Sequence, residues 1–85
     1  MARKKRTPEI RIQFGLAVKQ RREELGLTQE TLAAKAGLHR SYIGDIERGK
    51  RNIAIDNLSK LVEAMGLSVP AFFSKYHVGD GGPDA

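Results

Sequence analysis

The side chains best suited to directed polar chemistry lie between Arg40 and Arg48. At about 100° per residue, Ile43 and Ile46 share one face of a helix. The opposite face then presents the remaining polar or small residues to solvent: Arg40, Ser41, Gly44, Asp45 and Arg48. A guanidinium donates hydrogen bonds from a rigid fork that suits planar or anionic acceptors. This pattern predicts a binding surface carried on a short amphipathic helix.

The charge of the chain favours a polyanionic partner. The formal net charge is +5 over 85 residues, and it is unevenly placed. A basic arm precedes the first helical pattern, in the run Arg3, Lys4, Lys5 and Arg6. A basic arm on a mildly basic body suits nucleic acid. The alternative is a solvated terminus that only aids solubility.

Enzymatic and metal chemistry find little support. His39 and His77 are the only histidines, and they lie far apart without metal-ligand spacing. No cysteine supplies a thiolate or a disulfide, and no serine has a histidine and an acid arranged around it. The glycines Gly79, Gly81 and Gly82 follow no strand, so they do not form a phosphate loop. We expect no catalytic residue, metal or cofactor.

The elements that must position this surface are short helices. Apolar residues make up 40% of the chain, and no apolar run approaches the roughly 18 residues that a membrane span needs. Pro8, Thr28, Asp56 and Pro70 suit helix starts, and glycines suit the ends. The expected helices run over about 8–25, 28–36, 39–48, 57–65 and 69–75. We therefore predict an all-α domain over residues 9–75, with a flexible arm at 1–8 and a flexible tail at 76–85.

The inner face of the first helix is expected to carry Ile10, Phe14, Val18 and Leu25, which recur at helical spacing.

Residues 29–48 meet several requirements of a helix-turn-helix at once. Two helices that cross steeply with almost no linker need a small side chain at the crossing, where Ala33 stands. The turn needs a residue that tolerates positive φ, where Gly37 stands. Apolar groups must face inward, and they occupy the remaining positions: Leu32, Ala36, Leu38, Ile43 and Ile46. Each feature alone is weak, but together they indicate this motif.

The sequence resembles the Cro/repressor-type (XRE) helix-turn-helix family. The likeness rests on Leu27-Thr28-Gln29-Glu30, Leu32-Ala33, Ala36-Gly37, Tyr42-Ile43 and Ile46-Glu47-Arg48-Gly49, and it continues through Leu58, Leu61, Met65-Gly66-Leu67 and Phe72-Phe73. It covers about residues 12–75. Within the family, Arg40-Ser41-Tyr42-Ile43 with Arg51-Asn52 is especially similar to the controller proteins of restriction–modification systems.

The resemblance implies a five-helix, lambda-repressor-like fold that binds a palindromic operator as a homodimer. The second motif helix would enter the major groove of double-stranded DNA. The side chains that would face bases or nearby phosphates are His39, Arg40, Ser41, Tyr42 and Asp45. Arg40 suits O6 and N7 of guanine, or else it is a solvated or phosphate-bound arginine. Tyr42 suits a thymine methyl, a phosphate or packing beneath the first motif helix. Asp45 would accept from cytosine N4 or pair with Arg48 or another arginine.

Further positions follow from the resemblance as backbone contacts. The residues that would meet phosphates lie at the start of the first motif helix and after the second: Thr28, Gln29, Lys50, Arg51 and Asn52. Arg51 suits the minor groove as an alternative, and basic loop residues are also often merely solvated. The basic arm either tracks the DNA or stays free.

The resemblance also implies a structural ion pair between Arg22 and Glu47, largely buried between the first and third helices. The dimer surface would lie around the last helix, on Val69, Phe72 and Tyr76. Of the two adjacent phenylalanines, we expect Phe73 to fill the core and Phe72 to face the partner.

These inferences favour a cytoplasmic transcriptional regulator that requires no small-molecule ligand. One alternative is an antitoxin, which uses the same fold to bind operator DNA and a toxin protein. Another is a protein-interaction module with no role on DNA. Specific binding to the DNA upstream of its own gene distinguishes the regulator from the module, and the neighbouring gene distinguishes the controller from the antitoxin.

Overall fold

The computed structural model describes residues 9–80, and it folds them into five helices with no strand in that range. The helices are α1 (Glu9–Glu24), α2 (Gln29–Ala36), α3 (Arg40–Glu47), α4 (Ile55–Ala64) and α5 (Val69–Lys75). The predicted all-α class is confirmed. The expected basic arm at 1–8 and residues 81–85 lie outside the described residues. No helix of residues 9–80 is long and apolar enough to cross a membrane.

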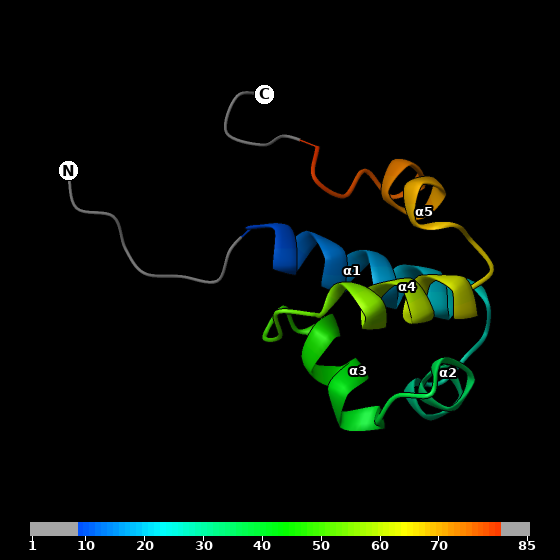
Figure 1. Cartoon of the computed structure of the whole chain (residues 1–85). Coiled ribbons are helices and arrows are strands. Elements are labelled where there is room, and N and C mark those ends of the chain that lie inside the picture. The colour runs from blue at the N-terminus through cyan, green and yellow to red at the C-terminus, as the bar shows by residue number, and fades with distance from the viewer. Residues whose placement is uncertain (1–8, 81–85) are drawn as a thin grey trace, which may run out of the picture.

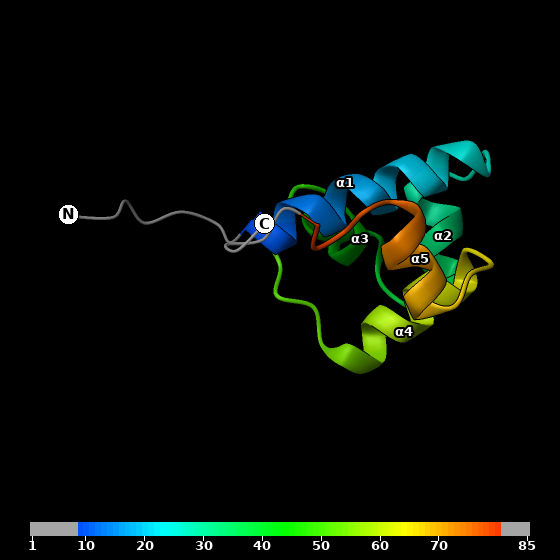
Figure 2. The same cartoon turned by 90° about the horizontal axis from the view of Figure 1, so that it is seen from above.

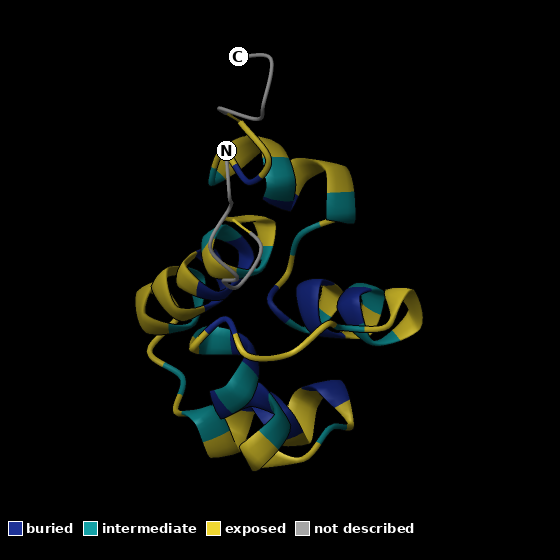
Figure 3. Cartoon of the chain, turned by 90° about the vertical axis from the view of Figure 1, so that its left-hand side faces the viewer, coloured by how far each residue is buried: buried dark blue, intermediate teal, exposed yellow. Residues whose placement is uncertain are grey.

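The helices divide into two groups about α1. The motif helices α2 and α3 lie on one side of α1, and α5 lies on the other (Figure 1). Seen from above, α5 and α4 lie on the same side of α1 (Figure 2). Helix α3 packs on α1 and α2, and α4 packs on α2 and α5. Buried residues lie on the sides of the helices that face one another, and exposed residues lie outside (Figure 3).

Local sequence chemistry fixes both ends of α2. The Thr31 N–H donates to Thr28 Oγ1 at 3.0 Å, and the Thr28 N–H donates to Thr31 Oγ1 at 2.8 Å. This reciprocal cap satisfies two amides that a helix start leaves unpaired. Gly37 ends the helix with φ 71°, in the left-handed region that favours glycine. Both ends of α2 lie where the sequence predicts them.

The start of α4 differs from the prediction. Asp56 was expected to cap this helix, but Ala54 is the N-cap and α4 begins at Ile55. The Leu58 N–H donates to the Ala54 carbonyl at 2.9 Å, so the first helical bond precedes Asp56. The Asp56 carboxylate instead lies in the first turn, where the helix dipole favours a negative charge.

The tightest helix crossing joins α1 to α3 at Gly15. A methyl group there would collide with the Ile46 carbonyl, so only glycine at position 15 lets the two backbones lie this close together. Only the middle of the expected α1 face is buried: Phe14 and Val18 are 5% and 0% exposed, whereas Ile10 and Leu25 are 45% and 41% exposed. The ends of α1 extend beyond the region where α3 packs against it.

The aromatic residues of α5 reverse the predicted assignment. Phe72 is 0% exposed and packs edge-on against Phe14, with ring centroids 5.6 Å apart. Phe73 is only partly buried at the margin of the core. Phe72 therefore fills the core of the monomer and is not available to a partner, contrary to the expectation for both residues. Both rings lie near Phe14, with the Phe73 centroid 5.8 Å away, but only Phe72 is fully enclosed.

Residues 76–80 pack onto α1, whereas a flexible tail was expected from residue 76. Val78 is 6% exposed and belongs to the core. His77 adopts φ 57°, which turns the chain back, and the Val78 N–H donates to the Phe73 carbonyl at 2.9 Å. The Gly79 N–H then donates to Gln13 Oε1 at 2.8 Å. A single apolar residue in a polar stretch is enough to dock this turn.

Candidate nucleic-acid interface

Helix α3 separates an apolar face from a polar one, as its periodicity predicts. Ile43 and Ile46 are 0% and 2% exposed, whereas Arg40 and Ser41 are exposed on the other face. His39 is the N-cap residue, exposed and without a side-chain capping bond. The first turn of α3 therefore carries an imidazole, a guanidinium and a hydroxyl into solvent.

Gly44 is buried, although its helical position predicts that it faces solvent. The Arg48 side chain folds back over it, and Nη1 lies 3.2 Å from the place where a Cβ of residue 44 would stand. The absence of a side chain at Gly44 leaves room for this guanidinium. Arg48 is thereby drawn along the outer face of α3.

A buried ion pair holds α3 against α1. Arg22 Nε donates to Glu47 Oε2 at 2.7 Å, and Nη2 donates to Oε1 at 3.1 Å. The two side chains are only 12% and 5% exposed. Arg22 Nη1 also donates to the Leu27 carbonyl at 2.8 Å, and the hydrogen bond to Glu47 raises the pKa of Arg22. The predicted pair is present, and its partners are hydrogen-bonded on several sides.

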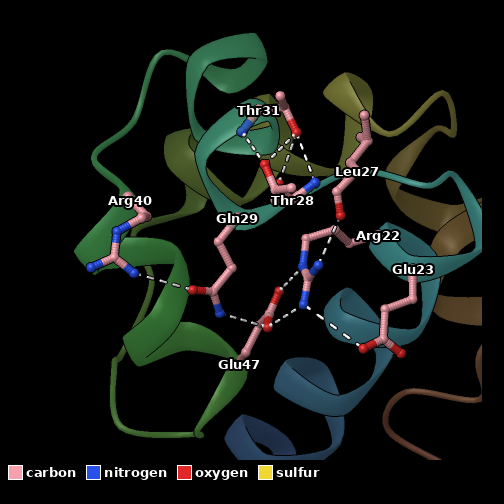
Figure 4. Close-up of polar contacts among 8 residues, drawn as sticks. All are labelled: Arg22, Glu23, Leu27, Thr28, Gln29, Thr31, Arg40 and Glu47. Atoms are coloured by element: carbon pink, nitrogen blue, oxygen red, sulfur yellow. Dashed lines mark hydrogen bonds and ion pairs between the residues drawn. The ribbon is translucent and has the colours of Figure 1, made fainter.

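Gln29 connects this buried pair to the exposed Arg40. Its Nε2 donates to Glu47 Oε1 at 3.0 Å, and its Oε1 accepts from Arg40 Nη1 at 3.4 Å (Figure 4). Arg40 Nε also lies 3.7 Å from Glu30 Oε2. The Gln29 amide was expected to meet a phosphate. In the described residues its side chain links the Arg22–Glu47 pair to the exposed guanidinium of Arg40.

Tyr42 lies partly buried between α3 and α4. Its hydroxyl accepts from Asn57 Nδ2 at 3.2 Å, and the Arg51 guanidinium lies 4.7 Å from the ring centroid. A shallow groove beside it is lined by His39, Ser41, Tyr42, Arg51 and Asn57. Nothing in the sequence pattern predicts that Asn57, on a different helix, holds this tyrosine.

Asp45 is paired on both sides by arginines. Its Oδ1 accepts from Arg48 Nη2 at 2.7 Å, and its Oδ2 lies 3.5 Å from Arg51 Nη2. Of the alternatives left open by the sequence, these contacts correspond to pairing with arginine. We call Tyr42, Gly44, Asp45, Arg48 and Arg51 the Asp45 cluster.

The other predicted backbone-contacting residues flank this surface. Lys50, Arg51 and Asn52 are exposed in the loop that follows α3, and Thr28 is exposed at the start of α2. In residues 9–80, no group of histidine, aspartate or glutamate side chains could hold a metal ion. The start of α3 and the residues that flank this helix therefore present hydrogen-bond donors and positive charge on one exposed surface.

The helix-turn-helix family model matches residues 18–72 of this chain, which include the whole of α2, α3 and α4. Among similar proteins, the control protein C.BamHI of Bacillus amyloliquefaciens is 47% identical over 62 residues, which are 72% of this chain and 76% of that protein. The control protein C.MunI of a Mycoplasma species is 40% identical over 67 residues, which are 78% of this chain and 90% of that protein.

Two of the similar solved structures illustrate the shared fold. The restriction–modification controller protein C.Esp1396I, solved as a tetramer in complex with its natural 35 base-pair operator, superposes with a TM-score of 0.77 and 34% identity, covering 82% of this chain and 92% of that chain. The controller protein C.AhdI of Aeromonas hydrophila gives a TM-score of 0.72 and 41% identity, covering 74% of this chain and 96% of that chain.

Proposed function

This chain belongs to the helix-turn-helix family, and we propose that it controls transcription as a homodimer bound to a two-fold-symmetric operator. Members of this family related to it are DNA-binding regulators, a class without enzymatic activity. The chain is accordingly a DNA-binding transcription regulator and not an enzyme. The proposal goes beyond the family in three respects: the symmetry of the operator, the number of subunits and the residues that contact DNA.

The first turn of α3 enters the major groove in this proposal. The side chains that face bases or adjacent phosphates are His39, Arg40, Ser41, Tyr42 and Asp45, as the resemblance implied. Arg40 carries the main base contact, since a bidentate bond to guanine is worth about 1–3 kcal/mol of discrimination. Phosphates are met from both flanks of α3, by Thr28, Gln29, Lys50, Arg51 and Asn52.

One observation carries this proposal. The apolar side of α3 is covered by the protein, with Ile43 0% exposed, while Arg40 and Ser41 on the other side are exposed. A helix in this state can lie in a groove about 12 Å wide without any rearrangement of the core. Gln29 and Glu30 meanwhile restrain Arg40 before DNA arrives.

A dimer follows from the reach of a single helix. One recognition helix reads only a few base pairs, so two copies on half-sites about one helical turn apart give a usable specificity. Val69 at the start of α5 and Tyr76 directly after its end remain the proposed interface residues, since Phe72 is buried. Both are only partly buried in the monomer. Gel filtration with light scattering tests the subunit number.

The narrower proposal is control of restriction–modification genes in the cytoplasm. Its support is the identity to the control proteins C.BamHI and C.MunI and the structural similarity to C.Esp1396I. A methyltransferase or endonuclease gene beside its own supports this proposal, and a small toxin gene in that place contradicts it.

Fluorescence anisotropy with the DNA upstream of its own gene tests the function directly. Arg40→Ala should lose at least about fivefold in affinity for the operator while weak binding to random duplex persists. Lys75→Ala is the matched control, because it removes one positive charge from α5, on the far side of α1 (Figure 1). If the wild-type protein binds no duplex even at low salt, DNA binding is refuted.

A further inference from the structure

The Asp45 cluster places a negative charge on the face proposed to meet DNA. Two guanidinium groups contact the Asp45 carboxylate: Arg48 Nη2 lies 2.7 Å from Oδ1, and Arg51 Nη2 lies 3.5 Å from Oδ2. All three side chains are open to solvent, with exposures of 34%, 57% and 46% respectively. A carboxylate on a DNA-facing surface repels the phosphates and weakens binding, unless its charge also acts on neighbouring side chains.

Each arginine of the cluster is held from two directions. Arg48 bonds to Asp45 and lies over Gly44, where any side chain would crowd its guanidinium. Arg51 bonds to Asp45 and stacks on the Tyr42 ring at 4.7 Å. Tyr42 is in turn fixed by the hydrogen bond from Asn57. Contacts from α3, α4 and the loop between them therefore give both guanidinium groups defined directions in the free protein.

Held guanidinium groups still have donors to offer. A guanidinium has five N–H groups, and the bonds to Asp45 occupy one on each arginine. DNA whose acceptors match these fixed directions is bound while the bonds to Asp45 remain. DNA whose acceptors lie elsewhere must pull an arginine away from Asp45 or accept the repulsion of its carboxylate.

We propose that Asp45 is a positioning residue that raises the discrimination between the operator and other DNA. It fixes Arg48 and Arg51 before DNA arrives, and its charge weakens their indiscriminate attraction to phosphates. Asp45 itself reads no base in this inference, which replaces the DNA contact given to it in the proposed function with a positioning role, because both of its carboxylate oxygens are already bonded to arginines. This inference rests on the proposed DNA-binding function, and it adds Arg48 to the side chains that meet the DNA.

Asp45→Asn tests the proposal because it keeps the shape of the side chain and removes its charge. Affinity is measured by anisotropy on two short duplexes, the operator defined by footprinting and a shuffled sequence of the same composition. We expect affinity for the shuffled duplex to rise about fivefold, the effect of one unit charge close to phosphate in water. The salt dependence of log K should steepen by about 0.9, as for one additional neutralised phosphate. Operator affinity should change less than twofold, so the ratio between the two duplexes falls.

Asp80→Asn is the matched control, because it makes the same change of formal charge in the turn after α5, away from α3. Its affinity for the shuffled duplex should stay within twofold of the wild type. The double variant with Arg48→Gln should return the shuffled-duplex affinity toward the wild-type value, since the released guanidinium is then absent.

Two results would overturn the proposal. Unchanged affinity and salt dependence on the shuffled duplex would show that Asp45 restrains nothing that DNA uses. Loss of operator affinity with no gain on the shuffled duplex would show that Asp45 supports the specific complex and does not hold the arginines back from other DNA. Both differ from a failure of the proposed function itself, in which the wild-type protein binds neither duplex.

Discussion

The buried pair between Arg22 and Glu47 should dominate the response of this domain to mutation. Arg22→Ala removes the partner of the Glu47 side chain, which is 5% exposed in the intact protein, and leaves Gln29 as its remaining hydrogen-bond donor. It also removes the donor to the Leu27 carbonyl. Breaking one side of a buried pair costs about 3–5 kcal/mol, because the stranded charge keeps its desolvation penalty. A domain of this size has a total stability of only about 4–13 kcal/mol.

Thermal unfolding followed by circular dichroism measures this loss. One kcal/mol lowers the melting temperature of a small domain by about 4–8 °C, so Arg22→Ala should melt at least 12 °C below the wild type. Operator affinity at 25 °C should fall with the folded fraction. The control is Arg48→Ala, which breaks an equally short but exposed pair with Asp45 and should cost less than about 1 kcal/mol.

A double variant separates the charge from the packing. Arg22→Met with Glu47→Leu removes both charges and keeps apolar volume, so it should unfold at a higher temperature than Arg22→Ala alone. A melting temperature of Arg22→Ala within 4 °C of the wild type would refute the reasoning, since the stranded carboxylate would then carry almost no penalty.

Two further substitutions test other contacts. Gly15→Ala forces a methyl group against the Ile46 carbonyl, and it should destabilise the fold by about 1–3 kcal/mol in urea unfolding, although alanine usually favours a helix. Tyr76→Phe removes the hydroxyl whose hydrogen bond lowers the pKa of Glu24. A group whose pKa is lowered by folding stabilises the protein above its ordinary pKa, and this stabilisation is lost as the pH falls through the pKa of the folded state. The melting temperature of Tyr76→Phe should therefore fall less than that of the wild type between about pH 5 and pH 3. An equal loss in both proteins would contradict that assignment.

The parts of the fold that are set by neighbours in sequence could be predicted. Thr28 caps α2 through residues of the same turn, and Gly37 ends it through its own backbone freedom. Ile43 and Ile46 are buried because a helix with a period of 3.6 residues places them together. The face of α3 that remains open follows directly from this pairing.

Features set by contacts between distant segments could not be predicted. Whether Phe72 or Phe73 enters the core depends on how α5 sits on Phe14, and both residues have equal hydrophobic value. Gly15 carries no local sign that Ile46 approaches it from another helix. Val78 stands in a stretch too polar to suggest packing, yet α1 provides a site for it.

The candidate site divides in the same way. The outward direction of Arg40 follows from helical spacing, but its link to Glu47 requires Gln29 to reach across from α2. Arg48 was predictable as a partner of Asp45 from its spacing on the helix, whereas the contact with Arg51 depends on the course of the loop after α3.

The contact at Gly15 limits how such a domain can acquire a new target sequence. Because main chain meets main chain where α1 crosses α3, enlarging or trimming core side chains cannot tilt the reading helix relative to the rest of the protein. Drift toward a different operator must therefore proceed by exchanging the outward side chains on a helix of fixed pose. Descendants with altered preferences should differ on that surface and retain glycine at the crossing.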